Sequence, residues 1–182
     1  MPNIFFTADT HFNHTKILAF EPMVRDFDSI QEHDEELIKR WNARVRPSDT
    51  IWHLGDVYLG KDQAHFIEIM KRLNGKKHLV RGNHDTFHTK TYLEAGFDGI
   101  YGVWPKYDFV MSHTPLHPDS VDRWKLNVHG HLHSHRVTKR MYNGEYDAQW
   151  EITDGRYFCV SVEQHGLTPV SLDEIRKASA NG

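Results

Sequence analysis

The stretch Val80-Arg81-Gly82-Asn83-His84-Asp85 decides how the rest of this 182-residue chain is interpreted. It continues a short apolar run that predicts a buried strand, and Gly82 lets the backbone turn sharply where that strand ends. The amide oxygen of Asn83 is a usable ligand for a divalent cation, and the imidazole of His84 can bind a metal or move a proton near neutral pH. The carboxylate of Asp85 can hold that imidazole in one tautomer.

Four other short apolar segments also end in polar side chains that can bind a metal. These side chains are Asp9 and His11 after residues 3–6, Asp56 after 50–54, His113 after 107–111, and His131 and His133 after 126–128. Alternate residues of an extended segment point to the same side, so the pairs spaced by two can face one point. In α/β folds, sites gather outside the carboxyl ends of strands. We therefore expect these side chains to meet.

With Asn83, the strand ends offer two carboxylates, one amide oxygen and four imidazoles, and no thiolate. This set of oxygen and nitrogen ligands suits ions such as Mn, Fe or Zn rather than a structural zinc site built from cysteines. Seven ligands are too many for one tetrahedral ion, but they fit two ions about 3.5–4 Å apart that share a carboxylate. We expect two divalent ions, with Mn favoured and Zn, Fe, Ni or Mg as alternatives.

Taken together, these motifs resemble the signature of calcineurin-like metallophosphoesterases. The matching motifs are, in chain order, Asp9-x-His11, Gly55-Asp56, Gly82-Asn83-His84-Asp85, His113 and Gly130-His131-x-His133. The resemblance covers the chain from residue 3 to about 133, and it looks closest to small single-domain members from bacteria and phages. It implies an α/β fold in which two sheets form a β-sandwich flanked by helices, with the site at strand ends.

The resemblance also implies a role for each residue. The implied ligand sets are Asp9, His11 and His133 for the first ion, and Asn83, His113 and His131 for the second. Asp56 would bridge the two ions, and a water activated between them would attack phosphorus in line. His84 would stabilise the developing charge or protonate the leaving group, and Asp85 would orient His84.

We expect a hydrolase of phosphate esters, with nucleotide-type or cyclic diesters favoured over monoesters. The ligand set is complete, His84 is present, and the predicted rim is aromatic, with Phe12, Tyr58 and Trp124. Loop position alone makes further residues candidates for substrate contact, namely His14, Arg25, Arg81, His117 and Trp124. The alternatives are a phosphomonoesterase, a nuclease of the same fold, and a metal-binding interaction module without turnover. The presence of His84 argues against the last of these.

Composition narrows the partners. A formal charge of −3 and short cationic clusters give no bulk attraction to nucleic acid, so we expect a small substrate and no stable complex with long nucleic acid. No apolar stretch approaches the 18 residues of a membrane span. A single cysteine, Cys159, and no recognisable signal peptide fit a reducing cytoplasm. The oligomeric state stays open.

Length predicts a single domain over residues 1–182. Hydrophobic periodicity and capping signals predict helices over residues 30–45, 62–73 and 89–95, with His33 on a solvated first turn. A strand is expected over residues 99–104. Segment 136–156 reads as a hairpin insertion with a turn at Asn143-Gly144, which could serve as a lid, an oligomer contact or extra strands on a sheet edge.

Overall fold

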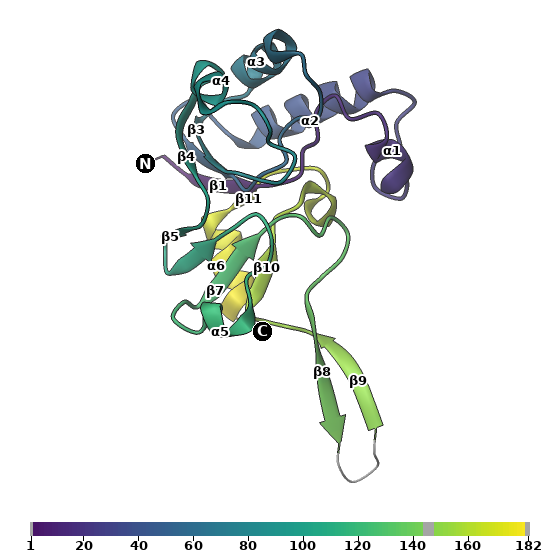
Figure 1. Cartoon of the computed structure of the whole chain (residues 1–182), viewed down its shortest axis with the longest axis vertical. Helices are drawn as coiled ribbons and strands as arrows, with labels where there is room; N and C mark the ends of the chain where they lie inside the picture. Colours follow the sequence, from purple (N-terminus) through teal and green to yellow (C-terminus); the bar gives the residue numbers. More distant parts are fainter. Residues whose placement is uncertain (1, 144–147, 181–182) are drawn as a thin grey trace.

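The fold is known from a computed structural model that describes residues 2–143 and 148–180. Two main sheets lie one above the other (Figure 1). The first sheet contains, in spatial order, β11 (Val170–Ser171), β1 (Ile4–Thr7), β2 (Thr50–His53), β3 (Lys76–Val80) and β4 (Phe97–Tyr101). The second contains β10 (Tyr157–Cys159), β7 (Leu126–His129), β6 (Phe109–Met111) and β5 (Trp104–Lys106). The predicted two-sheet sandwich is therefore confirmed.

Alternation along the strands produces two apolar layers. Phe5 of β1 and Ile51 of β2 pack with the buried faces of three helices, which are α2 (Ile30–Arg44), α3 (Gln63–Arg72) and α4 (Thr89–Glu94). Their neighbours Phe6 and Trp52 point the other way and pack with residues of β6 and β7 between the sheets. Ile175 of α6 (Leu172–Ala180) closes this inner layer. Because both faces of the first sheet are covered, its strands read as apolar runs.

The helices begin where their capping residues predict. The Ser29 side chain accepts a hydrogen bond from the Glu32 amide before α2, and Asp62 accepts one from the His65 amide before α3. Each bond satisfies an amide that has no partner within the first helical turn. His33, however, is fully buried rather than solvated. It lies four residues before Leu37, on the same helical face as the buried apolar stripe.

The strand predicted over residues 99–104 is wrong, because the chain changes sheets within it. β4 ends at Tyr101 after pairing with β3 in the first sheet, and β5 begins at Trp104 and pairs with β6 in the second. Gly102 lies in the crossing, where a continuous strand would have kept the chain in one sheet.

The predicted hairpin exists, as β8 (Thr138–Asn143) and β9 (Ala148–Thr153), but it does not extend a sheet edge. It forms a two-stranded sheet of its own that projects from the body of the molecule (Figure 1). It runs away from the carboxyl ends of the main strands, so it does not cover them as a lid. The predicted turn at Asn143-Gly144 reaches outside the described residues.

Three short elements complete the described chain, namely α1 (Ile17–Phe20), α5 (Pro118–Val121) and the 3-10 helix η1 (Val162–His165). Within residues 2–143 and 148–180, no helix is both long and apolar enough to cross a membrane. The main strands β1, β2 and β3 are parallel, and β6, β7 and β10 are parallel to one another. Their carboxyl ends lead into the loops that carry the predicted ligands.

Candidate metal centre

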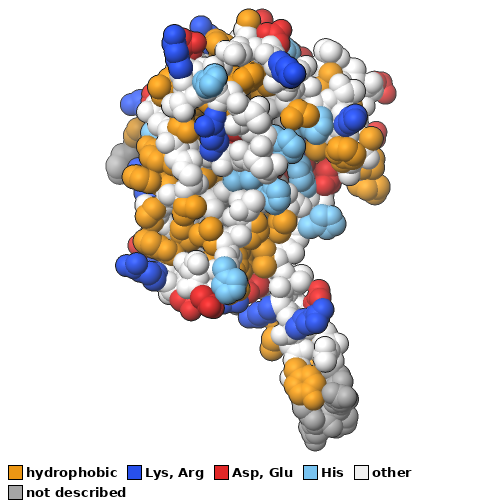
Figure 2. All heavy atoms as spheres, viewed as in Figure 1, with side chains coloured by type: hydrophobic (Ala, Val, Ile, Leu, Met, Phe, Trp, Pro, Cys, Tyr) orange, Lys and Arg blue, Asp and Glu red, His pale blue; other side chains and the backbone are white. Residues whose placement is uncertain are grey.

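The structure brings the predicted ligands together in two groups of three. In each group, one ligand atom from every side chain lies within 4.8 Å of the others. The two groups are Asp9, His11 and His133, and Asp56, His113 and His131. Figure 2 shows histidine side chains gathered on one face of the molecule, beside hydrophobic side chains over α1. Both groups draw on the two sheets, so the site lies where the sheets meet at their carboxyl ends.

Asp56 lies between the two groups. Its Oδ2 atom is 3.7 Å from His11 Nε2 on one side and 3.4 Å from His113 Nε2 on the other. Its Oδ1 atom accepts a hydrogen bond of 2.8 Å from the backbone amide of His84. One carboxylate therefore reaches both groups, as a bridging ligand must.

The backbone around the ligands is strained. Five ligand candidates have positive φ angles, namely Asp9 (55°), His11 (49°), Asp56 (56°), His131 (70°) and His133 (51°). A non-glycine residue in the left-handed region costs roughly 1 kcal/mol or more, and such residues cluster at functional sites. The tight turns let side chains from neighbouring residues converge on one point.

Two glycines allow the loops to approach this closely. A Cβ atom on Gly130 would lie 2.5 Å from Ala8 Cβ and 2.7 Å from Asp9 Oδ2. A Cβ atom on Gly82 would collide with the Asp56 carboxylate. Gly82 and Gly130 are thus required for close packing of the loops rather than for a left-handed conformation, whereas Gly55, before Asp56, has a positive φ of 97°.

The carboxylates and imidazoles of the centre perturb one another. Burial alone would raise the pKa of Asp56, but the hydrogen bond and charge of His113 bring it down to about 2. Burial opposes the cationic form of His113, but Asp56 and Asp9 raise the pKa of that imidazole to about 9. Burial raises the pKa of Asp9 to about 6. The centre therefore attracts cations, and protons compete for the same ligand atoms.

The donor set fits divalent ions. Asp9 Oδ1 and His11 Nε2 are buried polar atoms without a hydrogen-bond partner among the described residues. Buried polar atoms are seldom left unpaired, because the lost hydration costs about 1–3 kcal/mol. His113 donates from Nδ1 to the Leu54 carbonyl at 2.8 Å, which leaves Nε2 as its ligand atom. The residues present thus provide an unpaired oxygen and an unpaired nitrogen where the first ion would bind, and His113 Nε2 lies beside Asp56 Oδ2 and Asn83 Oδ1 in the second group.

Asn83 and His84 lie at the exposed mouth of the centre. Asn83 Oδ1 is 2.9 Å from His113 Nε2, which places the amide beside the second group. The ring of His84 lies 5.6 Å from the ring of His11, centroid to centroid. His84 is solvent-exposed, so its imidazole can reach a bound substrate.

Asp85 does not orient His84, contrary to the sequence interpretation. Its carboxylate is buried and accepts hydrogen bonds from three backbone amides, those of Asp56 (2.9 Å), Val57 (3.0 Å) and Gly82 (2.8 Å). It thereby joins the loop after β3 to the loop after β2. Asp85 positions the backbone of Asp56 and leaves the His84 ring free.

Three of the residues predicted to contact the substrate have different surroundings in the structure. His14 is half-buried beside the centre, with its Nδ1 atom 3.3 Å from His11 Nδ1. Arg25 is fully buried in an ion pair with Glu163, so the substrate role predicted for it is wrong. Arg81 Nε donates to the Asp85 carbonyl at 2.9 Å, and a second nitrogen donates to the Phe87 carbonyl. Both guanidinium groups are thus bound to the protein itself.

The aromatic rim predicted from the sequence is wrong. Phe12 and Tyr58 belong to the buried core. Trp124 lies next to the amino end of β7, in a surface pocket with Lys106 and Asp108, at the opposite end of the strands from the centre. The ring at the site is instead that of Phe20 on α1, which is 65% exposed and lies 6.1 Å from the His14 ring.

His117, the remaining candidate for substrate contact, caps α5. Its side chain accepts a hydrogen bond from the Asp119 amide, and the imidazole is exposed. The structure therefore gives His117 a local role at the start of a short helix.

Sequence reasoning missed two residues that contact the ligands. Ser161 donates to Asp9 Oδ2 at 2.6 Å, and Glu163 Oε1 lies 2.8 Å from His133 Nδ1. Both follow β10, so the rule that polar residues after a strand belong to the site would have found them. Neither residue stands next to a histidine or a glycine, since their neighbours are Val160, Val162 and Gln164, which is why the pattern was not recognised.

The comparisons with known proteins decide the family. A family model described as calcineurin-like phosphoesterase matches residues 2–176. The chain belongs to this family.

Relatives of this calcineurin-like phosphoesterase have similar lengths. An uncharacterized protein of Methanocaldococcus jannaschii is 32% identical and aligns over 100% of this chain and 94% of its own length. The gene 66 protein of Mycobacterium phage L5 is 31% identical, over 77% of this chain and 82% of its own. A solved structure from Aquifex aeolicus, of a protein of unknown function, has a TM-score of 0.67 and 26% identity, and covers 97% of this chain and 99% of its own.

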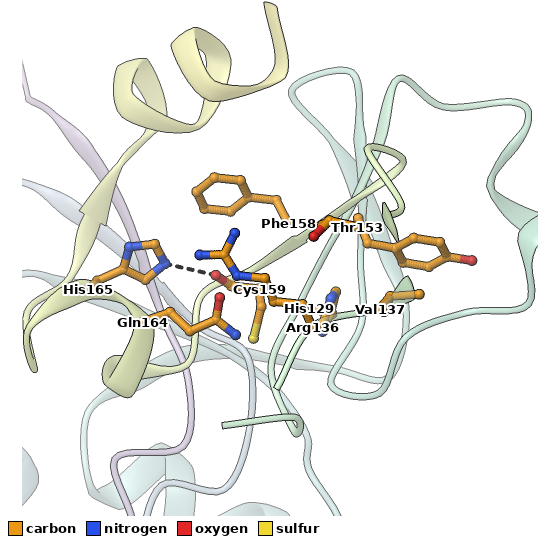
Figure 3. Close-up of a pocket in the computed structure, with 9 residues that line it drawn as sticks. His129, Arg136, Val137, Thr153, Phe158, Cys159, Gln164 and His165 are labelled. Carbon is orange, nitrogen blue, oxygen red and sulfur yellow. Dashed lines mark hydrogen bonds between the residues drawn. The ribbon is translucent and has the colours of Figure 1, made fainter. Parts of the chain in front are cut away.

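Membership makes this chain a phosphoric ester hydrolase by family, and the family typically binds two divalent metals. The two groups of carboxylate and imidazole ligands are consistent with that stoichiometry. A small pocket of about 90 Å³ lies elsewhere, between the base of the hairpin and η1 (Figure 3). None of the ligand candidates lines it, and it is too small for a nucleotide, since ligand pockets usually measure about 300–1,000 Å³.

Proposed function

We propose that this protein hydrolyses phosphodiesters of the nucleotide or cyclic-nucleotide type with two divalent ions, Mn favoured. The observation that carries the proposal is the position of Asp56 between two groups of three ligands, with His84 exposed beside them. This arrangement gives one carboxylate for both ions and one exposed imidazole for the substrate.

Each residue has a definable part in the reaction. Two bound divalent ions would supply an activated water and neutralise charge on the phosphoryl oxygens. Asp56 lies within reach of both ligand groups, and Asp85 holds the backbone of Asp56 by a hydrogen bond. His84 donates a hydrogen bond or a proton to the leaving oxygen. The hydrogen bond from the His84 backbone amide to Asp56 Oδ1 holds the backbone of His84 beside the bridging carboxylate.

Charge supports a diester over a monoester. A monoester carries about two negative charges at neutral pH and a diester carries one, so a monoesterase gains more from an additional cationic side chain at the phosphate. Arg25 and Arg81, the arginines predicted to supply it, are both bound to the protein itself. The exposed ring of Phe20 beside His14 offers a surface on which an aromatic ester group could stack.

The experiment compares a chromogenic phosphodiester, bis(p-nitrophenyl) phosphate, with p-nitrophenyl phosphate. Metal-stripped protein is reloaded in turn with Mn, Zn, Ni or Mg. We expect kcat/KM for the diester to exceed that for the monoester by about tenfold or more with Mn, which corresponds to about 1.4 kcal/mol in transition-state binding. Equal rates, or faster monoester hydrolysis, would refute the diester preference.

We also propose a cellular setting and a size for the substrate, and a second comparison of substrates tests the size. The single thiol, Cys159, is buried and free, which fits a reducing cytoplasm. We propose a small nucleotide-type substrate, given the net charge of −3. Cyclic and dinucleotide diesters should be cleaved faster than single-stranded oligonucleotides at 0.15 M salt. Preferential cleavage of the long strands would favour a nuclease instead.

A further inference from the structure

A chain of buried polar side chains runs from α2 to the centre. Asp34 Oδ1 lies 2.8 Å from His33 Nδ1, and His33 Nε2 lies 2.7 Å from Arg25 Nη1. The Arg25 guanidinium can only donate hydrogen bonds, so His33 Nε2 accepts one from it. His33 Nδ1 therefore carries the ring proton and donates a hydrogen bond to Asp34. Arg25 in turn donates to Glu163 Oε1 from Nε at 2.9 Å and from Nη2 at 2.6 Å. The same Glu163 oxygen accepts a hydrogen bond from Nδ1 of the His133 imidazole.

Arg25 also holds the loop that carries the other two ligands of the first group. Its Nη1 atom donates to the Thr10 carbonyl at 3.0 Å, and its Nη2 atom donates to the Asp9 carbonyl. The Asp34 carboxylate accepts from the Asn13 amide at 2.8 Å, two residues beyond His11. The network therefore ends on backbone and side chains of the first ligand group at several points.

Helix η1 is itself fixed in place. His165 Nε2 donates to the Cys159 carbonyl at 2.8 Å (Figure 3), and its ring stacks on Phe158. Gln164 donates from Nε2 to the carbonyls of His133 (2.8 Å) and His135 (2.7 Å). Neighbouring residues of η1 thus hold the His133 loop by its backbone and by its ring, although His133 has a strained positive φ of 51°.

A buried ion pair is weak evidence for stability alone. Removing two charges from water costs several kcal/mol per ion, and well-packed apolar residues often replace such pairs without loss of stability. Arg25 and Glu163 have no exposed side-chain surface. Their contacts end on the ligand loops, which indicates a role in geometry.

We propose that Glu163, held by Arg25, is a positioning residue that fixes the tautomer and the ring of His133. By accepting the Nδ1 proton, Glu163 leaves Nε2 as the nitrogen that binds the ion shared with Asp9 and His11. This inference rests on the proposed function, because it assigns a part to a residue outside the ligand set. It also gives the buried Arg25 a structural role in place of the substrate contact that was predicted from the sequence.

The test measures metal binding rather than turnover. Glu163→Gln keeps the size of the side chain and removes its charge. Titration calorimetry with Mn²⁺ should show the affinity for one ion falling about 10–100-fold, the usual scale for losing a partner of a ligating histidine, while the second ion binds within about threefold of wild type. The matched control is Glu174→Gln, which removes a glutamate paired with Arg44 on the surface. It should leave both affinities unchanged.

A variant that only loses thermal stability, with both Mn²⁺ affinities intact, would overturn the proposal. Should Glu163→Gln fail to fold, the wild-type protein still decides. With zinc as a diamagnetic probe, ¹⁵N NMR of the imidazoles should show His133 protonated at Nδ1 and coordinated through Nε2. Coordination through Nδ1 would overturn it. A wild type that binds two ions but cleaves no ester would refute the proposed function and leave this test readable.

Discussion

At the scale of single residues, it was easier to predict which side chains belong to the site than to predict which atoms they contact. The ligand types at five strand ends were evident from motif and spacing, and the structure brings six of those side chains into two groups. Asp85 shows the limit. A carboxylate next to a histidine was taken to orient that imidazole, but three backbone amides bind it instead. Local order in the sequence cannot reveal which distant amides lack partners.

Replacement of His84 by Ala tests its part in the reaction directly. The imidazole is exposed at the mouth of the centre and has no ligand role in either group of three, so metal binding should be retained. Loss of a general acid usually costs about 10²–10⁴-fold. We expect turnover of a cyclic-nucleotide diester, whose alkoxide leaving group needs a proton, to fall at least about 10²-fold in kcat. A fully active variant would show that His84 has no catalytic role.

Replacement of Asp85 by Asn should damage the centre without touching a ligand. One amide oxygen cannot replace two carboxylate oxygens that accept from Asp56, Val57 and Gly82, and the new NH₂ group would face backbone donors. Unpaired buried groups cost about 1–3 kcal/mol each. We expect the free energy of unfolding in urea to fall by about that amount, together with a loss of Mn²⁺ affinity. Wild-type values for both would contradict the role assigned to Asp85.

At the scale of elements, amphipathic helices and capped ends were predictable because their signals are local. The crossing between β4 and β5 was not, since its pairing partners, β3 and β6, lie in different sheets. The Arg25–Glu163 pair was missed for the same reason. Its members lie 138 residues apart in the chain, and a buried arginine is rare enough that loop position favoured a substrate contact.

The hairpin is a separable element. Within the described residues, β8 and β9 pair only with each other, and Thr138 faces Thr153 at their base, so a short linker can close the gap. We expect replacement of residues 139–152 by Gly-Ser-Gly to leave diester turnover within about twofold of wild type and the melting temperature within a few degrees. Steady-state kinetics and thermal unfolding provide the measurement. A tenfold loss of kcat would show that the hairpin contributes to the site.

Three apolar side chains share one face of this hairpin. Met141 faces Trp150 across the strands, and Ile152 lies on the same face, two residues along β9. All three side chains are partly exposed. Comparing sedimentation of the shortened and intact proteins in the same experiment therefore also reports on the oligomeric state, which the sequence left open.

At the scale of the whole molecule, the fold class followed from the sequence because its motifs match a family whose model spans residues 2–176. The two-layer core explains why a small number of motif residues was enough to predict the fold class. Strand residues alternate between the helix layer and the inter-sheet layer, and this alternation leaves the strand ends for chemistry. Positions that depend on three-dimensional packing, such as the burial of His33 and Phe12, required the structure.

Stability should depend on pH through His53, which is buried and stacked near Trp41. Thr10 Oγ1 donates to the Val57 carbonyl, so it accepts from His53 Nε2, and His53 Nδ1 has no described partner. Burial lowers the pKa of His53 from 6.5 to about 3. Between these values the unfolded chain binds the proton and the folded chain does not. Stability therefore falls as the pH falls, by about 1.4 kcal/mol per pH unit from this group.

Urea unfolding of metal-free protein at pH 7.5, 6 and 5 gives the measurement, with His53→Gln as the comparison. The variant retains a side-chain donor for Thr10 but cannot titrate, so the wild type should lose more stability than the variant below pH 6.5. Parallel stability profiles for the two proteins would contradict a neutral, buried His53. Contributions from carboxylates and imidazoles remote from His53 are common to both proteins and cancel in the difference.

The measurement that tests the dinuclear centre most directly is the number and coupling of bound Mn²⁺ ions. Metal-stripped protein is titrated with Mn²⁺, and stoichiometry and electron paramagnetic resonance are recorded together. A carboxylate within reach of both ligand groups predicts two ions per chain with an exchange-coupled spectrum, and at most one tightly bound ion in Asp56→Ala. One ion per chain in the wild type, or two ions with uncoupled spectra, would contradict a bridged centre.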